Sequence, residues 1–168
     1  GWCPLVPELR HLLPGWPRAD SLALDPHKGL FLPYGTGALL VRNGEDLRAL
    51  HASHAGYLPD NQLEFYDPAQ YGPDLSRGFP GLRVWMCLKI FGAARYRAAI
   101  AEKRELAVWA AQRIAAIPGI VMDALPQLSL FAFHLEGKGL DTLDAQNQAT
   151  RELMERVTRR GKVMLTGA

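Results

Sequence analysis

The stretch ALDPHKGLFLPYGTGALLVRN, residues 23–43, constrains the fold more than any other part of the chain. It sets Lys28 between a histidine and a glycine, with apolar runs on both sides that are typical of buried strands. SLALD (21–25) and GALLVRN (37–43) are the clearest strands, and LFLP between them is also apolar. We therefore expect two or three short buried strands folded back around Lys28, with the glycines of GTG permitting the tight return.

On either side of this stretch, the pattern predicts helices and a long loop. A short helix is expected over 7–13, and another over 45–53 with Asn43 as its N-cap. Residues 54–80 are rich in Gly, Pro, Asp and Tyr and follow neither the helical nor the strand period. Loops of this length are uncommon unless they are functional or mobile, so this segment is a candidate active-site lid.

The second half of the chain predicts long helices followed by strands. Apolar residues recur at intervals of three and four over 82–117, and Gly92 either divides two helices or kinks one. Pro118 and Gly119 end this helical region. The elements expected after them are strands over 120–123 and 128–135, a helix over 143–160 and a strand over 162–165. Together they predict an α+β unit in which one layer of amphipathic helices covers a small sheet.

The composition excludes several classes of protein. With 48% hydrophobic and 21% charged residues the chain is typical of a globular protein, and a net charge of +2 with scattered arginines argues against a nucleic-acid-binding surface. The two cysteines, Cys3 and Cys87, are too far apart in sequence to suggest a disulfide framework. The apolar runs fall short of the roughly 18 to 20 residues that span a bilayer. We expect a cytoplasmic protein with neither a membrane nor a nucleic acid as partner.

Lys28 is the residue whose setting is hardest to explain by structure alone. Between apolar strands its amine is either exposed at a turn or desolvated in a pocket. Desolvation lowers the pKa of a lysine and makes the amine a nucleophile for imine formation with a carbonyl. The pattern by itself leaves both interpretations open. Other chemistries lack support: His51 and His54 have no acid or cysteine at ligand spacing, so no metal site is expected, and no serine lies in a Gly-x-Ser-x-Gly frame.

The stretch DSLALDPHKGLFLPYGTGALLVRN resembles the active-site region of the group II pyridoxal-phosphate-dependent amino acid decarboxylases, the family of aromatic L-amino acid decarboxylase and its bacterial relatives. LSRGFPGLRVWMCLKIFG is similar to the family's segment after its mobile loop, and LSLFAFHLEG and ELMERVTRRGKVMLTG resemble its C-terminal domain. The resemblance covers essentially the whole chain. It implies an α/β fold of the fold-type I, aspartate aminotransferase-like superfamily. Residues 1–82 are then the end of the large cofactor domain with its mobile loop, and 83–168 are most of the α+β C-terminal small domain.

The resemblance also assigns roles to single residues. Lys28 is implied to form the imine with pyridoxal 5'-phosphate, and His27 and Asp25 to hold the phosphate end of the cofactor, although relatives often have asparagine at the Asp25 position. Tyr57 in the predicted lid matches the loop tyrosine that protonates the carbanion carbon. Arg77 matches the arginine of the family's SR-x-F-R element, although the residues that follow it depart from that element.

The implied activity is decarboxylation of an L-amino acid, aromatic by overall similarity, to the amine and carbon dioxide through aldimine and quinonoid intermediates. The implied partners are the small-molecule substrate and a second subunit in a homodimer. The family's other cofactor-binding residues precede its lysine, so the chain resembles a C-terminal fragment that is expected to be inactive on its own. The alternatives are an aminotransferase or lyase of the same superfamily, and a non-catalytic interaction domain in which Lys28 is a turn lysine.

Overall fold

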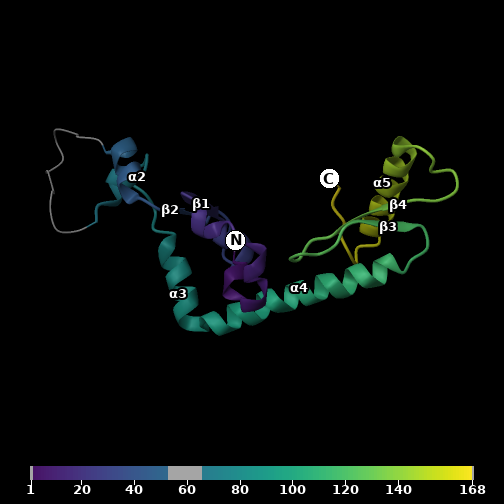
Figure 1. The fold of residues 1–168 in the computed structure, drawn as a ribbon, viewed down its shortest axis with the longest axis horizontal. Coiled ribbons are helices and arrows are strands. Elements are labelled where there is room, and N and C mark those ends of the chain that lie inside the picture. The colour runs from purple at the N-terminus through teal and green to yellow at the C-terminus, as the bar shows by residue number, and fades with distance from the viewer. Residues whose placement is uncertain (1, 53–65, 168) are drawn as a thin grey trace. The chain divides into compact units, whose positions relative to one another are not determined.

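The computed structural model describes residues 2–52 and 66–167. The chain divides into two compact units, Gly1–Ala98 and Ala99–Ala168, and the division falls within a long helix. Figure 1 traces the elements along the chain from purple to yellow. The predicted domain boundary after residue 82 concerns the organisation of a larger protein and stays a prediction.

The first unit begins with three short 3₁₀ segments, Cys3–Leu5, Pro7–Leu12 and Trp16–Arg18, each with proline in its first turn. They lead into β1 (Ser21–Leu24), which pairs antiparallel with β2 (Ala38–Val41) so that Ser21 lies opposite Val41. The expected fold-back around Lys28 is confirmed. LFLP, between these two strands, is not a third strand; its two leucines, Leu30 and Leu32, are buried in the core.

The two strands are not buried, contrary to the sequence prediction. Leu39 and Leu40 are 57% and 53% exposed, and since neighbouring residues of a strand point to opposite faces, solvent reaches both faces of this small sheet. Apolar composition predicts a strand that can be buried. It does not by itself supply the layers that bury it.

Helix α2 (Gly44–His51) follows β2 and confirms the predicted cap. The Asn43 side chain accepts a hydrogen bond from the Glu45 N–H at 3.2 Å, which satisfies one of the free donors at the helix start. Residues 54–65 of the predicted lid lie outside the described residues. Its described remainder contains one 3₁₀ turn, Pro68–Tyr71, which contacts α2.

Gly92 divides α3 (Gly81–Phe91) from α4 (Ala93–Ala115), as one of the two sequence alternatives predicted. Its φ of 77° lies in the left-handed region, which glycine adopts without strain. The core of the first unit forms where α3 and the start of α4 meet the segment after Lys28. It consists of Leu30, Leu32 and Tyr96, with Trp2, Leu5, Val84, Cys87 and Leu88 packed against them.

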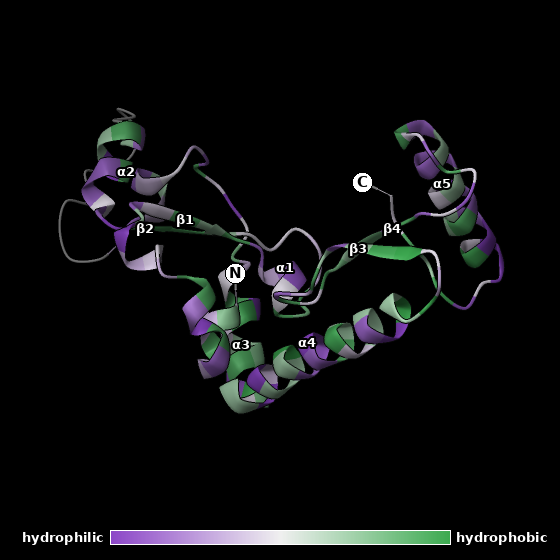
Figure 2. Ribbon diagram, turned by 45° about the vertical axis from the view of Figure 1, so that its right-hand side comes forward, coloured by the Kyte–Doolittle hydropathy of each residue, from purple (hydrophilic) through white to green (hydrophobic). Residues whose placement is uncertain are grey.

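Other large apolar side chains of α3 point away from this core. Trp85 and Ile90 are more than half exposed, and Figure 2 shows the hydrophobic colour along much of this helix. Cys87, in contrast, lies on the inner face and packs against the core. The helix is therefore apolar on more faces than the described core uses.

The second unit contains the hairpin β3 (Ile120–Ala124) and β4 (Ala132–Leu135) and the helix α5 (Leu143–Arg159). A bulge at Asp123 interrupts the antiparallel register. Thr142 caps the start of α5, because its hydroxyl accepts from the Ala145 N–H at 3.2 Å. The helix contacts β4. The described chain thus has two separate two-stranded sheets in place of the single helix-covered sheet predicted.

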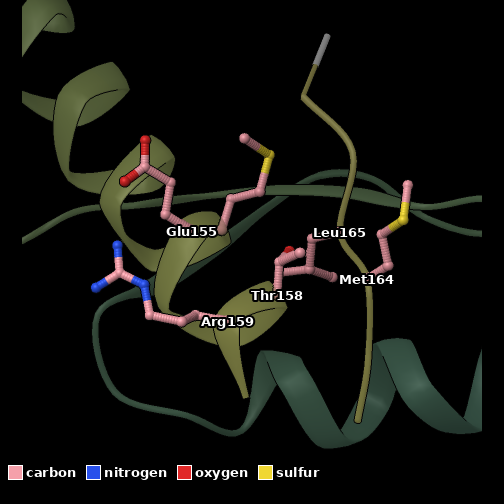
Figure 3. A pocket seen from close by; sticks show the side chains of 6 residues that line it. Glu155, Thr158, Arg159, Met164 and Leu165 are labelled. Carbon is pink, nitrogen blue, oxygen red and sulfur yellow. The ribbon is translucent and has the colours of Figure 1, made fainter. Parts of the chain in front are cut away.

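The predicted strand over 162–165 is wrong, because no strand lies beside this segment to take up its backbone hydrogen bonds in the described residues. The segment instead runs extended near the end of α5. Figure 3 shows Met164 and Leu165 next to Thr158 and Arg159, and together with Met154 and Glu155 they line a shallow hollow. Among the described residues, the predicted site residues Asp25, His27 and Lys28 do not line this hollow.

His134 on β4 is bound by two carboxylates. Its Nδ1 lies 2.8 Å from Asp123 Oδ1, and its Nε2 lies 3.1 Å from Glu136 Oε1. Both nitrogens can donate only when the ring is protonated, so the hydrogen bonds to Glu136 and then to Asp123 raise the pKa of His134 above its usual value. The two contacts therefore favour the protonated form of the ring across the bulged hairpin.

None of the helices in the described part of the chain combines the length and hydrophobicity that a membrane crossing requires.

Candidate active site

Lys28 lies on a single helical turn, α1 (Pro26–Gly29), which follows β1. Pro26 begins the turn because its ring presets the helical φ and its missing N–H is not needed there. Two N–H groups donate to the Asp25 carbonyl at 3.0 and 3.3 Å, and the Leu30 N–H donates to the Pro26 carbonyl at 3.0 Å. Pro26 and Leu30 are both buried, which anchors one side of the turn. The histidine and lysine between them are left on the accessible side.

The Lys28 amine is exposed and paired with Asp25. Nζ lies 2.7 Å from Oδ2, and the two side chains are 72% and 47% exposed. This hydrogen bond raises the pKa of Lys28 above its usual value and lowers that of Asp25. Of the two interpretations that the sequence left open, the described chain therefore shows the first, a lysine exposed at a turn. A desolvated lysine with a lowered pKa is not observed in it. The physical reason is that the strands around it are themselves open to solvent.

His27 is held to the GTG turn by two hydrogen bonds to one oxygen. The carbonyl of Thr36 accepts from the His27 backbone N–H at 3.3 Å and from its ring nitrogen Nδ1 at 2.9 Å. Because a carbonyl can only accept, Nδ1 carries a proton in this contact. The arrangement fixes the ring and leaves Nε2 for another partner.

Two residues that the sequence analysis did not single out complete this arrangement. Thr36 is only 1% exposed and its hydroxyl donates to the Pro33 carbonyl at 3.1 Å, while Gly35 before it takes a φ of 85°. The Tyr34 ring meets the His27 ring edge-on, with centroids 5.0 Å apart. The GTG motif signalled a turn correctly, but nothing in its letters indicated that its carbonyl binds the histidine.

Of the remaining predicted residues, Arg77 is described and is not brought to this turn. Tyr57 lies outside the described residues. The Arg77 guanidinium donates to the Pro68 and Asp74 carbonyls, so it stabilises the loop before α3. No group of three or more His, Cys, Asp or Glu side chains within 2–52 and 66–167 is placed to hold a metal ion.

A family model described as the pyridoxal-dependent decarboxylase conserved domain matches residues 1–136. The chain belongs to this family. The match includes the turn that carries His27 and Lys28, and the cofactor that gives the family its name is pyridoxal phosphate. The predicted family and cofactor are therefore confirmed.

Several curated proteins resemble this family member over nearly its whole length. The aromatic-L-amino-acid decarboxylase of Bacillus atrophaeus is 33% identical over 162 residues, which are 92% of this chain and 33% of the relative. Tryptophan decarboxylase 1 of Oryza sativa is 27% identical over 94% of this chain and 32% of the relative. A 4-hydroxyphenylacetaldehyde synthase of Rhodiola rosea is also 27% identical, over 97% of this chain and 33% of the relative. The chain spans about a third of the length of these relatives.

The fold agrees with solved decarboxylase structures. The crystal structure of Oryza sativa TDC with PLP and tryptamine superposes with a TM-score of 0.89 at 26% identity, covering 97% of this chain and 34% of that one. The predicted α/β, fold-type I class is thus confirmed. The roles assigned to Lys28, His27, Asp25 and Tyr57 stay predictions.

Proposed function

We propose that the protein is a pyridoxal-phosphate-dependent carboxy-lyase that removes the carboxylate of an L-amino acid, with aromatic amino acids as the first substrates to try. The observation that carries this proposal is the turn that presents Lys28 and His27 together, inside the segment that the family model matches. The names of the relatives, which include aromatic-amino-acid and tryptophan decarboxylases, support the substrate class.

The residues on the turn fit the cofactor. An aldehyde needs an accessible primary amine, and Lys28 Nζ is accessible. A phosphate needs hydrogen-bond donors. The Thr36 carbonyl holds Nδ1–H of the His27 ring, so Nε2 is the nitrogen that faces another partner, and it donates when it also carries a proton. Both groups project from one four-residue turn, so one ligand can meet both.

When bound, pyridoxal phosphate supplies an electron sink for the bond between Cα and the carboxylate of the substrate. We propose that Lys28 provides the amine that holds the cofactor. Because Nδ1 of His27 already carries the proton that faces Thr36, Nε2 can donate to the phosphate only in the doubly protonated ring, and we propose that this cationic form meets the phosphate. Asp25 holds the amine in place but opposes its deprotonation, because the carboxylate favours the ammonium form. Tyr57 is the predicted donor of the proton that replaces the lost carboxylate.

A cytoplasmic homodimer is part of this proposal. The support from the described residues is the exposed apolar surface of β2 and α3, which is typical of surfaces that contact more protein. Sedimentation of the protein at its full natural length measures the subunit number directly.

The test uses the full-length protein, pyridoxal phosphate and borohydride, followed by mass mapping of the modified peptides. Residues 1–98 contain only two lysines, Lys28 and Lys89, so Lys89→Ala is a matched control for Lys28→Ala. Labelling confined to Lys28 and lost only in Lys28→Ala supports the proposal. Labelling spread over surface lysines, or none, contradicts it.

A product assay with L-tryptophan, L-tyrosine and L-phenylalanine then identifies the reaction. Carbon dioxide with an equal amount of amine is the expected result. A keto acid without carbon dioxide indicates an aminotransferase. Carbon dioxide with an aldehyde indicates chemistry like that in the name of the Rhodiola relative.

A further inference from the structure

Position 29, directly after Lys28, requires glycine because of a neighbouring side chain, Trp2, and not because of its backbone conformation. A Cβ added to Gly29 would stand 2.3 Å from Cδ1 and 3.2 Å from Cγ of the Trp2 indole, far inside van der Waals contact. Gly29 is not among the residues with positive φ, and it lies in the helical turn α1. Any other residue could adopt this backbone, so the indole is what requires glycine here.

The indole is held on its other sides by the core of the first unit. Trp2 packs against the buried cluster of Leu30, Leu32 and Tyr96, and its carbonyl accepts from the Leu5 N–H at 3.1 Å. Its ring nitrogen Nε1 is buried without a hydrogen-bond partner in the described part of the chain. Because a buried, unpaired N–H is unfavourable, shape and not polar bonding sets the position of this ring.

Trp2 therefore lies against the end of α1 where backbone bonds close the turn. The Gly29 N–H bond to Asp25 and the Leu30 N–H bond to Pro26 are both made at this end. A displacement of Gly29 away from the indole would carry Lys28 with it, since the two residues are adjacent. The same displacement would alter the 2.7 Å contact between Lys28 Nζ and Asp25.

We propose that Trp2 is a positioning residue for Lys28: its indole fills the space beside Gly29 and so fixes the direction in which the lysine amine leaves the turn. The importance of this for catalysis rests on the proposed function, but the positioning itself does not. It predicts that positions 2 and 29 are coupled by volume. A side chain at 29 is tolerated only when the one at 2 is reduced.

The experiment is a double-mutant cycle in the full-length protein, with variants Gly29→Ala, Trp2→Ala and the two combined. The first readout is the pH profile of Lys28 acylation, followed by mass spectrometry without any cofactor, with Lys89 as an internal control. The second is the yield of pyridoxal phosphate trapped on Lys28 by borohydride. Circular dichroism and the unfolding midpoint report separately on folding.

We expect Gly29→Ala to move the midpoint of Lys28 acylation to lower pH as the contact with Asp25 is lost. We also expect it to reduce trapped cofactor about tenfold, a factor that corresponds to about 1.4 kcal/mol and lies within the usual cost of overpacking. Lys89 should not change. In the combined variant, the new methyl group occupies space that the indole has left. Both readouts should return toward those of the unchanged protein.

Two results overturn the proposal: a Gly29→Ala protein with an unchanged Lys28 profile, or a combined variant that is no better than Gly29→Ala. If Gly29→Ala does not fold, the combined variant decides the matter, since recovery of folding and of the Lys28 profile supports the coupling and failure to recover refutes it. If Lys28 of the unchanged protein traps no cofactor, the proposed function fails. The acylation profile still tests the positioning in that case.

Discussion

The two ring nitrogens of His27 have different roles: Nδ1 binds the Thr36 carbonyl, and Nε2 is proposed to bind the cofactor phosphate. A matched pair of substitutions tests the two roles separately. The Asn amide nitrogen occupies nearly the position of Nδ1, so His27→Asn keeps the hydrogen bond to the Thr36 carbonyl and removes Nε2. The Gln amide nitrogen lies near the position of Nε2, so His27→Gln keeps a donor for the phosphate and removes the 2.9 Å bond to Thr36. Both variants lose the edge-on contact with Tyr34, so this contact cancels between them.

The expected magnitudes follow from the bonds involved. A hydrogen bond to a charged group contributes about 1.5–3 kcal/mol. His27→Asn should therefore weaken the binding of pyridoxal phosphate by about 10- to 150-fold, since 1.4 kcal/mol corresponds to a factor of ten. His27→Gln should bind the cofactor more tightly than His27→Asn. It should also be less stable, by the roughly 0.5–1.5 kcal/mol of a neutral hydrogen bond.

The assay is an absorbance titration of the full-length protein with pyridoxal phosphate, together with the unfolding midpoint of each variant without cofactor. Opposite rankings of the two variants in affinity and in stability support the division of roles. An Asn variant that binds cofactor as the unchanged protein does would refute the role of Nε2. Equal stability of the two variants would refute the role of Nδ1.

Three further predictions follow from contacts of the described residues. Asp25→Asn removes the charge that raises the pKa of Lys28, so the pH midpoint of lysine acylation should fall toward the ordinary value for a lysine. Attack of the amine on an aldehyde at neutral pH should become faster. An unchanged midpoint would contradict the role of the ion pair. Because the pKa of His134 is raised in the folded state, the protonated ring stabilises the fold fully at a pH below its unfolded pKa near 6.5. This stabilisation is lost as the pH rises through the raised pKa. Unfolding midpoints measured across this pH range should show the loss, and the pH dependence should be absent in His134→Gln. Leu30→Ala should lower the free energy of unfolding, measured in urea, by about 2–5 kcal/mol because this side chain is only 2% exposed. Leu39→Ala, at an exposed position, should change the free energy of unfolding by about 0.5 kcal/mol or less. Similar losses for both variants would show that burial is wrongly assigned.

Local structure could be predicted from the sequence because its causes are local. The cap at Asn43 and the break at Gly92 depend on side chains and φ angles within a few residues. The cap was predicted correctly, and the break is one of the two alternatives predicted at Gly92. The same holds for the turn at GTG. Helix α5 was also predicted to within one residue, because its amphipathic period and the arginines at its end are visible in the letters.

The environment of Lys28 could not be predicted, because it depends on what packs against the flanking strands. Apolar letters around the lysine suggested burial, whereas Leu39 and Leu40 are exposed in the described chain and the amine pairs with Asp25. The contact between Trp2 and Gly29 was invisible for a similar reason. It joins residues that are 27 positions apart (29 − 2) and that no short motif connects.

The anchor of His27 is a main-chain oxygen, and this has a consequence for evolution. The carbonyl at position 36 is present whichever residue occupies that position, so a substitution there cannot delete the acceptor. Selection acting on the histidine would therefore leave no matching change at position 36, and covariation between aligned relatives would not reveal the contact. Attachments of this kind are inherited with the path of the backbone, and only coordinates disclose them.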